Sequence, residues 1–190
     1  VLYETVRAFA EEKLAEGALM RPTIKRHQEW CIRLAQDLVA AEDAGAADAT
    51  AKLILERPNL ETAFQRAWSE RSEAVPHLGL ALVWFFRTRE APQRGLIYVE
   101  RGLACVGEEG DATLRARLLL AKGTLLGRSS NVEGIVPLKK ATALVPNTSR
   151  IAAEIHIALG RAYRNGLRWE EAGASYQLAN RILALEGPSL

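Results

Sequence analysis

The stretch AGASYQLA at residues 172–179 places two small residues seven positions apart, with one large residue between them. The same arrangement stands in GLIYVERG at 95–102 and in GIVPLKKA at 134–141. The stretches recur at intervals of 39 and 38 positions, and intervals of this length are typical of repeat proteins. On a helix, residues four and seven positions apart share a face, so each stretch predicts a helix that a neighbour approaches closely. The predicted contact positions are Gly95, Val99, Gly102, Gly134, Leu138, Ala141, Ala172, Tyr176 and Ala179.

The composition is that of a folded globular protein. Of the 190 residues, 48% are hydrophobic and 25% are charged, which supports a full core. The longest apolar stretch, residues 78–86, is about half of what a bilayer requires, and the first residues lack the pattern of a signal peptide. We therefore expect a cytoplasmic protein without membrane contact. Cys31 and Cys105 each stand in an apolar helical stretch, which predicts two buried free thiols.

Charge is distributed unevenly along the chain. Residues 1–75 carry 10 Lys and Arg against 13 Asp and Glu, whereas residues 76–190 carry 15 against 10. The two parts therefore have net charges of −3 and +5. This excess is modest for nucleic-acid binding, but it favours anionic ligands in the second part of the chain.

Apolar residues three and four positions apart, together with turn signals, predict an all-α fold of about ten helices and no strand. Short linkers make the last six helices three antiparallel pairs. We divide the chain into a helix at 1–18, linking helices at 19–72, and pairs at 73–108, 109–147 and 148–190. The expected helices are one ending at Glu16, one from Pro22 to Gly45, Ala49–Leu55, one from Pro58 to Trp68, Val75–Arg89, Pro92–Val106, Asp111–Leu126, one from Asn131, Ser149–Asn165 and Trp169–Leu185.

One proline conflicts with this scheme. Ser130 and Glu133 form a capping box that starts a helix near Asn131. Pro137 would then lie in the second turn, where it removes a hydrogen bond and clashes with the carbonyl of Glu133. The helix is therefore either kinked at Pro137 or begins later than the capping box predicts.

The third pair resembles a tetratricopeptide repeat. The residues that carry the resemblance are Leu159, Gly160 and Tyr163 in the first helix and Ala172, Tyr176 and Ala179 in the second. The interval of 38 to 39 positions is longer than the usual length of about 34 for this motif. The resemblance implies a right-handed superhelical array of antiparallel helix pairs, in which Gly160 and Tyr163 pack between helices. Such arrays bind protein partners or ligands.

The first part of the chain resembles a different kind of segment. The string LYETVRAFA at residues 2–10, Arg26-His27 ahead of Trp30, and RPNL at 57–60 are similar to the segment after the nucleotide-binding domain of STAND-type (NB-ARC-type) signalling ATPases. Many of these are bacterial regulators of the AfsR and LuxR kinds. The resemblance implies that 1–18 is the last helix of a winged-helix module and that the chain is a piece of a longer regulator of transcription.

In that family, a helical-repeat arm senses an inducer or partner, while upstream nucleotide-binding and effector domains act on the signal. This chain has no Gly-x-x-x-x-Gly-Lys-Ser/Thr loop, so we do not expect the arm to hydrolyse ATP. Our prediction is a non-catalytic sensor or scaffold domain. The alternatives are an accessory domain of a cyclase-linked regulator and a module for homo-oligomerisation.

The resemblance also places candidate ligand contacts, because the first helix of each tetratricopeptide pair lines a concave surface. The candidates are His77, Trp84, Arg87, Arg117, Arg161 and Arg164, with Leu80, Leu120, Thr124, Gly127, Glu154 and Ile157 on the same face. Guanidinium groups hold carboxylates or phosphates with paired hydrogen bonds, so this surface suits an extended peptide or a small anionic inducer. The alternative is that the arginines are solvated and Trp84 lies in the core.

No pattern in the sequence predicts catalysis, a cofactor or a metal site. His27 and Cys31 share a helix face, but two ligands are too few for structural zinc. The chain lacks a Gly-x-Ser-x-Gly elbow, and its adjacent carboxylates point about 100° apart on a helix. Basic residues near Lys25 and at Lys139-Lys140 are interrupted by acidic ones, so we expect no direct contact with nucleic acid.

Overall fold

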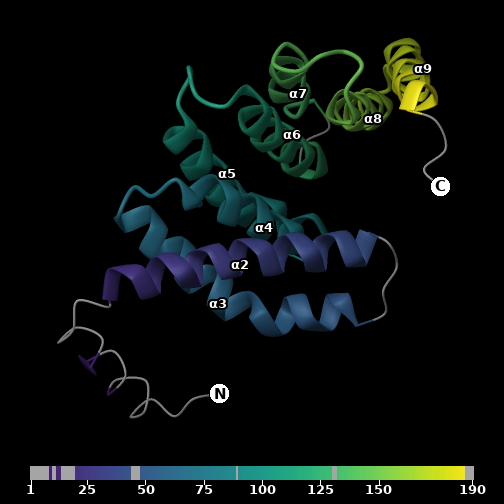
Figure 1. The fold of residues 1–190 in the computed structure, drawn as a ribbon. Coiled ribbons are helices and arrows are strands. Elements are labelled where there is room, and N and C mark those ends of the chain that lie inside the picture. Colours follow the sequence, from purple (N-terminus) through teal and green to yellow (C-terminus); the bar gives the residue numbers. More distant parts are fainter. Residues whose placement is uncertain are drawn as a thin grey trace.

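The computed structural model describes residues 9, 12, 13, 20–43, 48–88, 90–129 and 132–186. Within these residues the fold is all-α, with eight helices and no strand, and consecutive helices lie against one another (Figure 1). The helices are α2 (Met20–Asp43), α3 (Ala49–Ser69), α4 (Ala74–Thr88), α5 (Pro92–Val106), α6 (Ala112–Ser129), α7 (Ile135–Thr142), α8 (Arg150–Asn165) and α9 (Trp169–Glu186). The winged-helix prediction at 1–18 falls almost entirely outside the described residues.

The ends of the paired helices follow from local chemistry. The Asp111 carboxylate accepts a hydrogen bond of 3.0 Å from the backbone N–H of Leu114, and the Ser149 hydroxyl accepts one of 3.2 Å from Ala152. Each bond satisfies an N–H that has no partner within its helix. Pro92 stands at the start of α5, where its missing N–H costs nothing, and Gly107 ends that helix with a φ of 69°. Within the predicted pairs, α4 contacts α5, α6 contacts α7 and α8 contacts α9.

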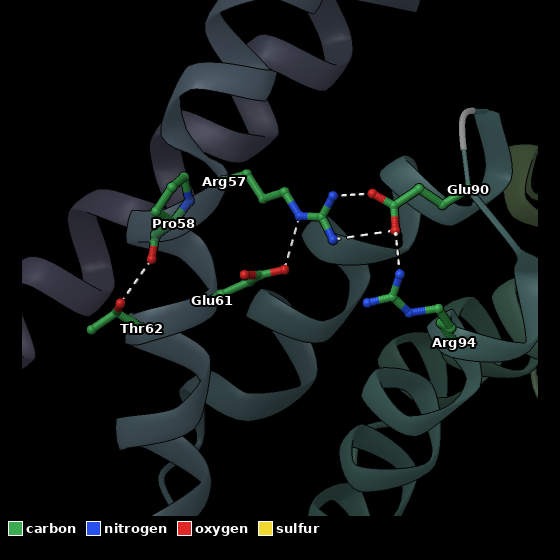
Figure 2. A network of polar contacts seen from close by, with 6 residues as sticks. All are labelled: Arg57, Pro58, Glu61, Thr62, Glu90 and Arg94. Atoms are coloured by element: carbon green, nitrogen blue, oxygen red, sulfur yellow. Dashed lines mark hydrogen bonds and ion pairs between the residues drawn. The ribbon is translucent and has the colours of Figure 1, made fainter.

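The predicted break at Pro58 is wrong, because α3 continues through it from Ala49 to Ser69. Pro58 removes one hydrogen bond of the helix, a loss of about 3 kcal/mol. Leu53 and Leu60 lie on opposite sides of the proline, and both are completely buried against the same cluster. Their burial holds the helix together across the proline, and the hydroxyl of Thr62 donates a hydrogen bond of 2.8 Å to the Pro58 carbonyl (Figure 2).

The conflict at Pro137 is resolved by a late start. Helix α7 begins at Ile135, not near Asn131, so Pro137 lies in its first turn and is buried there. The proline therefore removes no hydrogen bond that the helix needs. Ser130 of the predicted capping box lies outside the described residues.

Two apolar clusters form the core. One is built mainly from α2 to α5 and the other from α7 to α9. Helix α6 supplies Leu118 and Leu125 to the first and Ala116 and Leu119 to the second. The linking helices therefore share their core with the first pair, and α6 joins both clusters.

The run Trp84-Phe85-Phe86 is buried throughout. Its rings meet different neighbours: Phe86 stacks on Tyr98 of α5 with ring centres 5.5 Å apart, and the Arg57 guanidinium of α3 lies over the ring of Phe85 at 5.1 Å. Three successive side chains can be buried because α4 is covered on several sides by α2, α3, α5 and α6. Arg57 also belongs to a polar network between α3 and the α4–α5 turn (Figure 2).

The predicted small-residue positions lie where helices approach closely. A Cβ atom on Gly95 would stand 2.7 Å from the Cβ atom of Phe86, and one on Gly134 would stand 2.3 Å from the backbone oxygen of Gly123. A Cβ atom on Gly160 would meet the Tyr176 ring at 2.6 Å. The other predicted packing positions are also buried, apart from the half-buried Tyr176: Val99, Gly102, Leu138, Ala141, Tyr163, Ala172 and Ala179. The thiol prediction is confirmed for buried Cys31 but wrong for Cys105, which is exposed.

Candidate functional site

Three helix ends enclose a hollow of about 230 Å³. The ends are those of α4, α6 and α8, the first helices of the three pairs. We call this hollow the arginine pocket. Its lining is Arg87, Gly123, Thr124, Gly127, Arg128, Ala158, Arg161, Ala162, Arg164 and Asn165. Five of these positions were predicted from the sequence to share one face: Arg87, Thr124, Gly127, Arg161 and Arg164.

Among the residues that the structure describes, no acidic side chain lines the arginine pocket. In the described part of the chain, Arg87, Arg161 and Arg164 make no ion pair, and all three are exposed. Arg128 is different, because its guanidinium donates hydrogen bonds to the backbone carbonyls of Phe86, at 3.0 Å, and of Arg87. Three guanidinium groups are therefore available to a ligand, while Arg128 fixes the end of α4 beside them.

The helix ends themselves oppose part of this positive charge. Arg87, Arg128 and Arg164 stand in the last turns of α4, α6 and α8, where the helix dipole is negative. Each helix end is equivalent to about half a negative charge, so three ends offset about 1.5 of the four positive charges. The pocket retains a clear positive excess, which favours an anion.

Small residues make room between the arginines. Gly123, Gly127, Ala158 and Ala162 form part of the lining, and a Cβ atom added to Gly127 would meet nothing within 4 Å. The space at Gly127 is therefore open, in contrast to the tight helix crossing at Gly123. A volume of about 230 Å³ suits a carboxylate or phosphate group with a few attached atoms, and is below the size of most sites for whole cofactors.

Two of the remaining predicted contacts lie in a second hollow, of about 590 Å³, between α2, α4 and α6. His77 and Arg117 line it together with Asp111 and with the apolar side chains of Leu80 and Leu114. The structure thus places five of the six predicted contacts in two hollows, three in the arginine pocket and two in this one. His77 and Arg117 lie near the beginnings of α4 and α6, and Arg87 and Gly127 lie ten residues further along, which is about 15 Å of helix.

Trp84 belongs to neither hollow. Its side chain is only 4% exposed and packs in the first cluster, edge-on against Phe85 with ring centres 5.1 Å apart. This is a correction to the predicted contact set, since a buried indole offers no surface to a ligand. Sequence reasoning missed Arg128, although a basic residue in the last turn of the helix, next to Gly127, was a usable signal.

The groups with the greatest chemical reactivity lie elsewhere and are not activated. His27 approaches Cys31 with Nε2 3.7 Å from Sγ, but burial raises the pKa of the Cys31 thiol to about 11, with a contribution from Glu56. Burial and Arg66 lower the pKa of His27, against an opposing effect of Glu56. A thiol with so high a pKa is a poor nucleophile and a poor metal ligand. His27 instead stacks on Trp30, with ring centres 6.1 Å apart.

The described residues contain no group of three or more His, Cys, Asp or Glu side chains placed to hold a metal ion. None of their helices has the length and apolar character needed to cross a bilayer. In comparisons with known proteins, no family model, no curated protein and no solved structure matches the chain.

Proposed function

We propose that this chain is a non-catalytic binding domain that holds the anionic group of a peptide or small inducer in the arginine pocket. The observation that carries the proposal is the meeting of Arg87, Arg161 and Arg164, from two different helices, in a hollow that no acidic side chain of the described residues lines. Exposed arginines alone contribute little to stability, so their convergence has no evident structural purpose. A guanidinium group binds carboxylates and phosphates with paired hydrogen bonds, which supplies the needed specificity.

The larger setting of the proposal is a right-handed superhelical array of tetratricopeptide-like pairs. The close helix crossings at Gly123 and Gly160 support this arrangement, as does the shared face of the first helices. On the sequence resemblance alone, we further propose that the domain is the sensor or scaffold arm of a STAND-type regulator.

The test is isothermal titration calorimetry, in which the chain is titrated with inorganic phosphate and, separately, with a short poly-glutamate peptide. We expect the double variant Arg161→Ala/Arg164→Ala to weaken binding at least tenfold, since two charged hydrogen-bond donors are lost. The matched control is Arg181→Ala/Lys139→Ala, which removes the same charge from exposed positions outside the pocket. Equal binding by both double variants, or no binding by the unaltered chain, would refute the proposal.

A steric variant separates the pocket from general charge attraction. Gly127→Leu fills open space and keeps every arginine, so it should block binding without harming the fold. Gly173→Leu is its control, because a Cβ atom at Gly173 also meets nothing within 4 Å and the residue lies on α9. If Gly127→Leu bound as well as the control, charge alone would explain the attraction.

A second candidate function is self-association. It is favoured by apolar side chains that lie exposed on the α8–α9 turn and on α9: Leu167 is 72% exposed, Trp169 63% and Leu185 73%. Light scattering over a range of concentrations tests it. A mass that rises with concentration and falls back in Trp169→Ser would support this candidate, and a constant monomer mass would remove it.

A further inference from the structure

A buried amide in α2 lacks a partner. Gln28 is only 4% exposed, and its Nε2 atom is the one buried side-chain nitrogen or oxygen in the described residues without a hydrogen bond. A buried donor without a partner has lost its hydrogen bonds to water and makes none in the protein, which destabilises the fold. Such a donor calls for an acceptor that is supplied by something other than this part of the chain.

Gln28 borders two hollows, of about 390 and 480 Å³, between α2 and the α3–α4 turn. Gln28, Lys25 and Ser72 line both of them. The Ser72 oxygen accepts a hydrogen bond of 3.2 Å from the backbone of Ala74, so its own proton remains available. Three donors therefore line the same place: an amide, a hydroxyl and an ammonium group.

Acidic groups line these hollows as well. Glu29 and Glu73 line the smaller hollow, and Glu70 lines the larger. In the described residues none of the three carboxylates makes an ion pair, and neither does Lys25, although all of them border the same space. Separate donors and acceptors, each unpaired, suit a ligand that carries both signs of charge.

We propose that this site binds a free α-amino acid. Its carboxylate accepts hydrogen bonds from the Gln28 amide, the Ser72 hydroxyl and Lys25, and its ammonium group faces Glu29 and Glu73. Ile32 lines the same hollow and offers apolar surface to the ligand side chain. Peptides lack this pairing of charges on one carbon atom, because their two charged termini are apart. The site is distinct from the arginine pocket, so either can fail without the other.

The direct test is NMR of the ¹⁵N-labelled chain, followed at the side-chain amide of Gln28. L-Leucine should shift this signal in a saturable manner. Acetate, which carries only the carboxylate, should bind at least tenfold more weakly, and isopentylamine, which carries only the ammonium group, should leave the signal unchanged. An unmoved signal with leucine, or equal affinity for leucine and acetate, would overturn the proposal.

Variants distinguish a binding role from a structural one. Gln28→Met keeps the shape and removes the unpaired donor, so it should raise the unfolding temperature and abolish the leucine-dependent rise in that temperature. Gln36→Met, on an exposed part of the same helix, is the control and should keep the leucine effect. The exposed variant Lys25→Met should weaken leucine binding about tenfold with the fold intact. A leucine effect that survives both Gln28→Met and Lys25→Met would refute the site.

Discussion

The first and third helix pairs carry the same pattern of small residues but use it in opposite ways. In the third pair the glycine is Gly160 on the first helix, and the ring of Tyr176 from the second helix lies over it. In the first pair the bulk comes from the first helix, as Phe86, and the glycine is Gly95 on the second. The pattern therefore locates the close approach of two helices, but it does not say which helix supplies the large side chain.

The largest effect is expected in the middle pair, where backbone meets backbone. A Cβ atom at Gly134 would lie 2.3 Å from the Gly123 oxygen and 3.0 Å from the Gly127 nitrogen. Since neither atom can move without its helix, Gly134→Ala should lower the free energy of unfolding by about 3 kcal/mol. Urea unfolding measures this. A loss below about 1 kcal/mol would show that the pairs are not held by close contact at these positions.

Two substitutions with smaller expected effects test whether the first and third pairs place the glycine on opposite helices. We call this difference the inversion. Gly95→Ala meets the Cβ and Cγ atoms of Phe86 at 2.7 and 2.8 Å, close to the backbone of α4, and should cost about 2 kcal/mol. Gly160→Ala meets only the ring of half-buried Tyr176, which can turn aside, and should cost about 1 kcal/mol. The same unfolding measurement compares the two.

Second-site changes provide the control for this comparison. Replacing Tyr176 by Leu in the Gly160→Ala background should restore part of the loss, because the offending ring atoms are gone. Replacing Phe86 by Leu in the Gly95→Ala background should restore nothing, because leucine keeps the Cβ and Cγ atoms that clash. Equal rescue in both pairs, in a double-mutant cycle, would contradict the inversion.

The turns of the two pairs also differ, and pH separates them. Glu90 in the α4–α5 turn pairs with Arg57 of α3 and, at 3.6 Å, with Arg94 (Figure 2). Leu167 in the α8–α9 turn is instead exposed. The hydrogen bond from Arg57 lowers the pKa of Glu90, against partial desolvation. A carboxylate with a lowered pKa stabilises the fold above its ordinary pKa of about 4.3, and this contribution disappears as pH falls through the lowered value.

Glu90→Gln should therefore lower stability by about 1 kcal/mol at pH 7 and flatten the loss of stability between about pH 5 and pH 3. Chemical unfolding at several pH values measures both. Glu171→Gln in the third pair is the control: Arg168 also lowers the pKa of Glu171, but this exposed pair lies at the start of α9 and does not connect separate helices. A pH dependence that is the same in both variants would remove the distinction between the turns.

The smallest effect is expected where a glycine has no packing role. Gly173 lies inside the repeated stretch of α9, yet a Cβ atom there meets nothing within 4 Å. Gly173→Ala should raise the free energy of unfolding by about 0.5–1 kcal/mol, because alanine favours the helix and nothing is displaced. Any destabilisation would contradict this expectation, because it would mean that other atoms pack against α9 at Gly173.

Much of this architecture follows from spacing and capping residues alone. The helices that begin at Pro92 and after Ser149 lie as predicted, because apolar periodicity, a first-turn proline and a serine cap are local signals. The break at Pro58 was mispredicted for a non-local reason: burial of Leu53 and Leu60 depends on α2 and α4, which the local sequence does not reveal.

The candidate site shows the same limit. The resemblance to tetratricopeptide repeats placed Arg87, Arg161 and Arg164 on one face, and they line one pocket. It also assigned Trp84 to that face, but α4 is surrounded by other helices and the indole is buried. Arg128 was missed because its role depends on the carbonyls at the end of α4, far away in sequence.

The position of helix α6 has a consequence for how the molecule unfolds. With Leu118 in one cluster and Leu119 in the other, neighbouring residues of a single helix serve both halves of the chain. Heating that loosens either half withdraws support from the helix on which the other half rests. Melting should spread from one to the other as a cooperative whole, and a shortened chain that ends after α6 would leave Ala116 and Leu119 facing water.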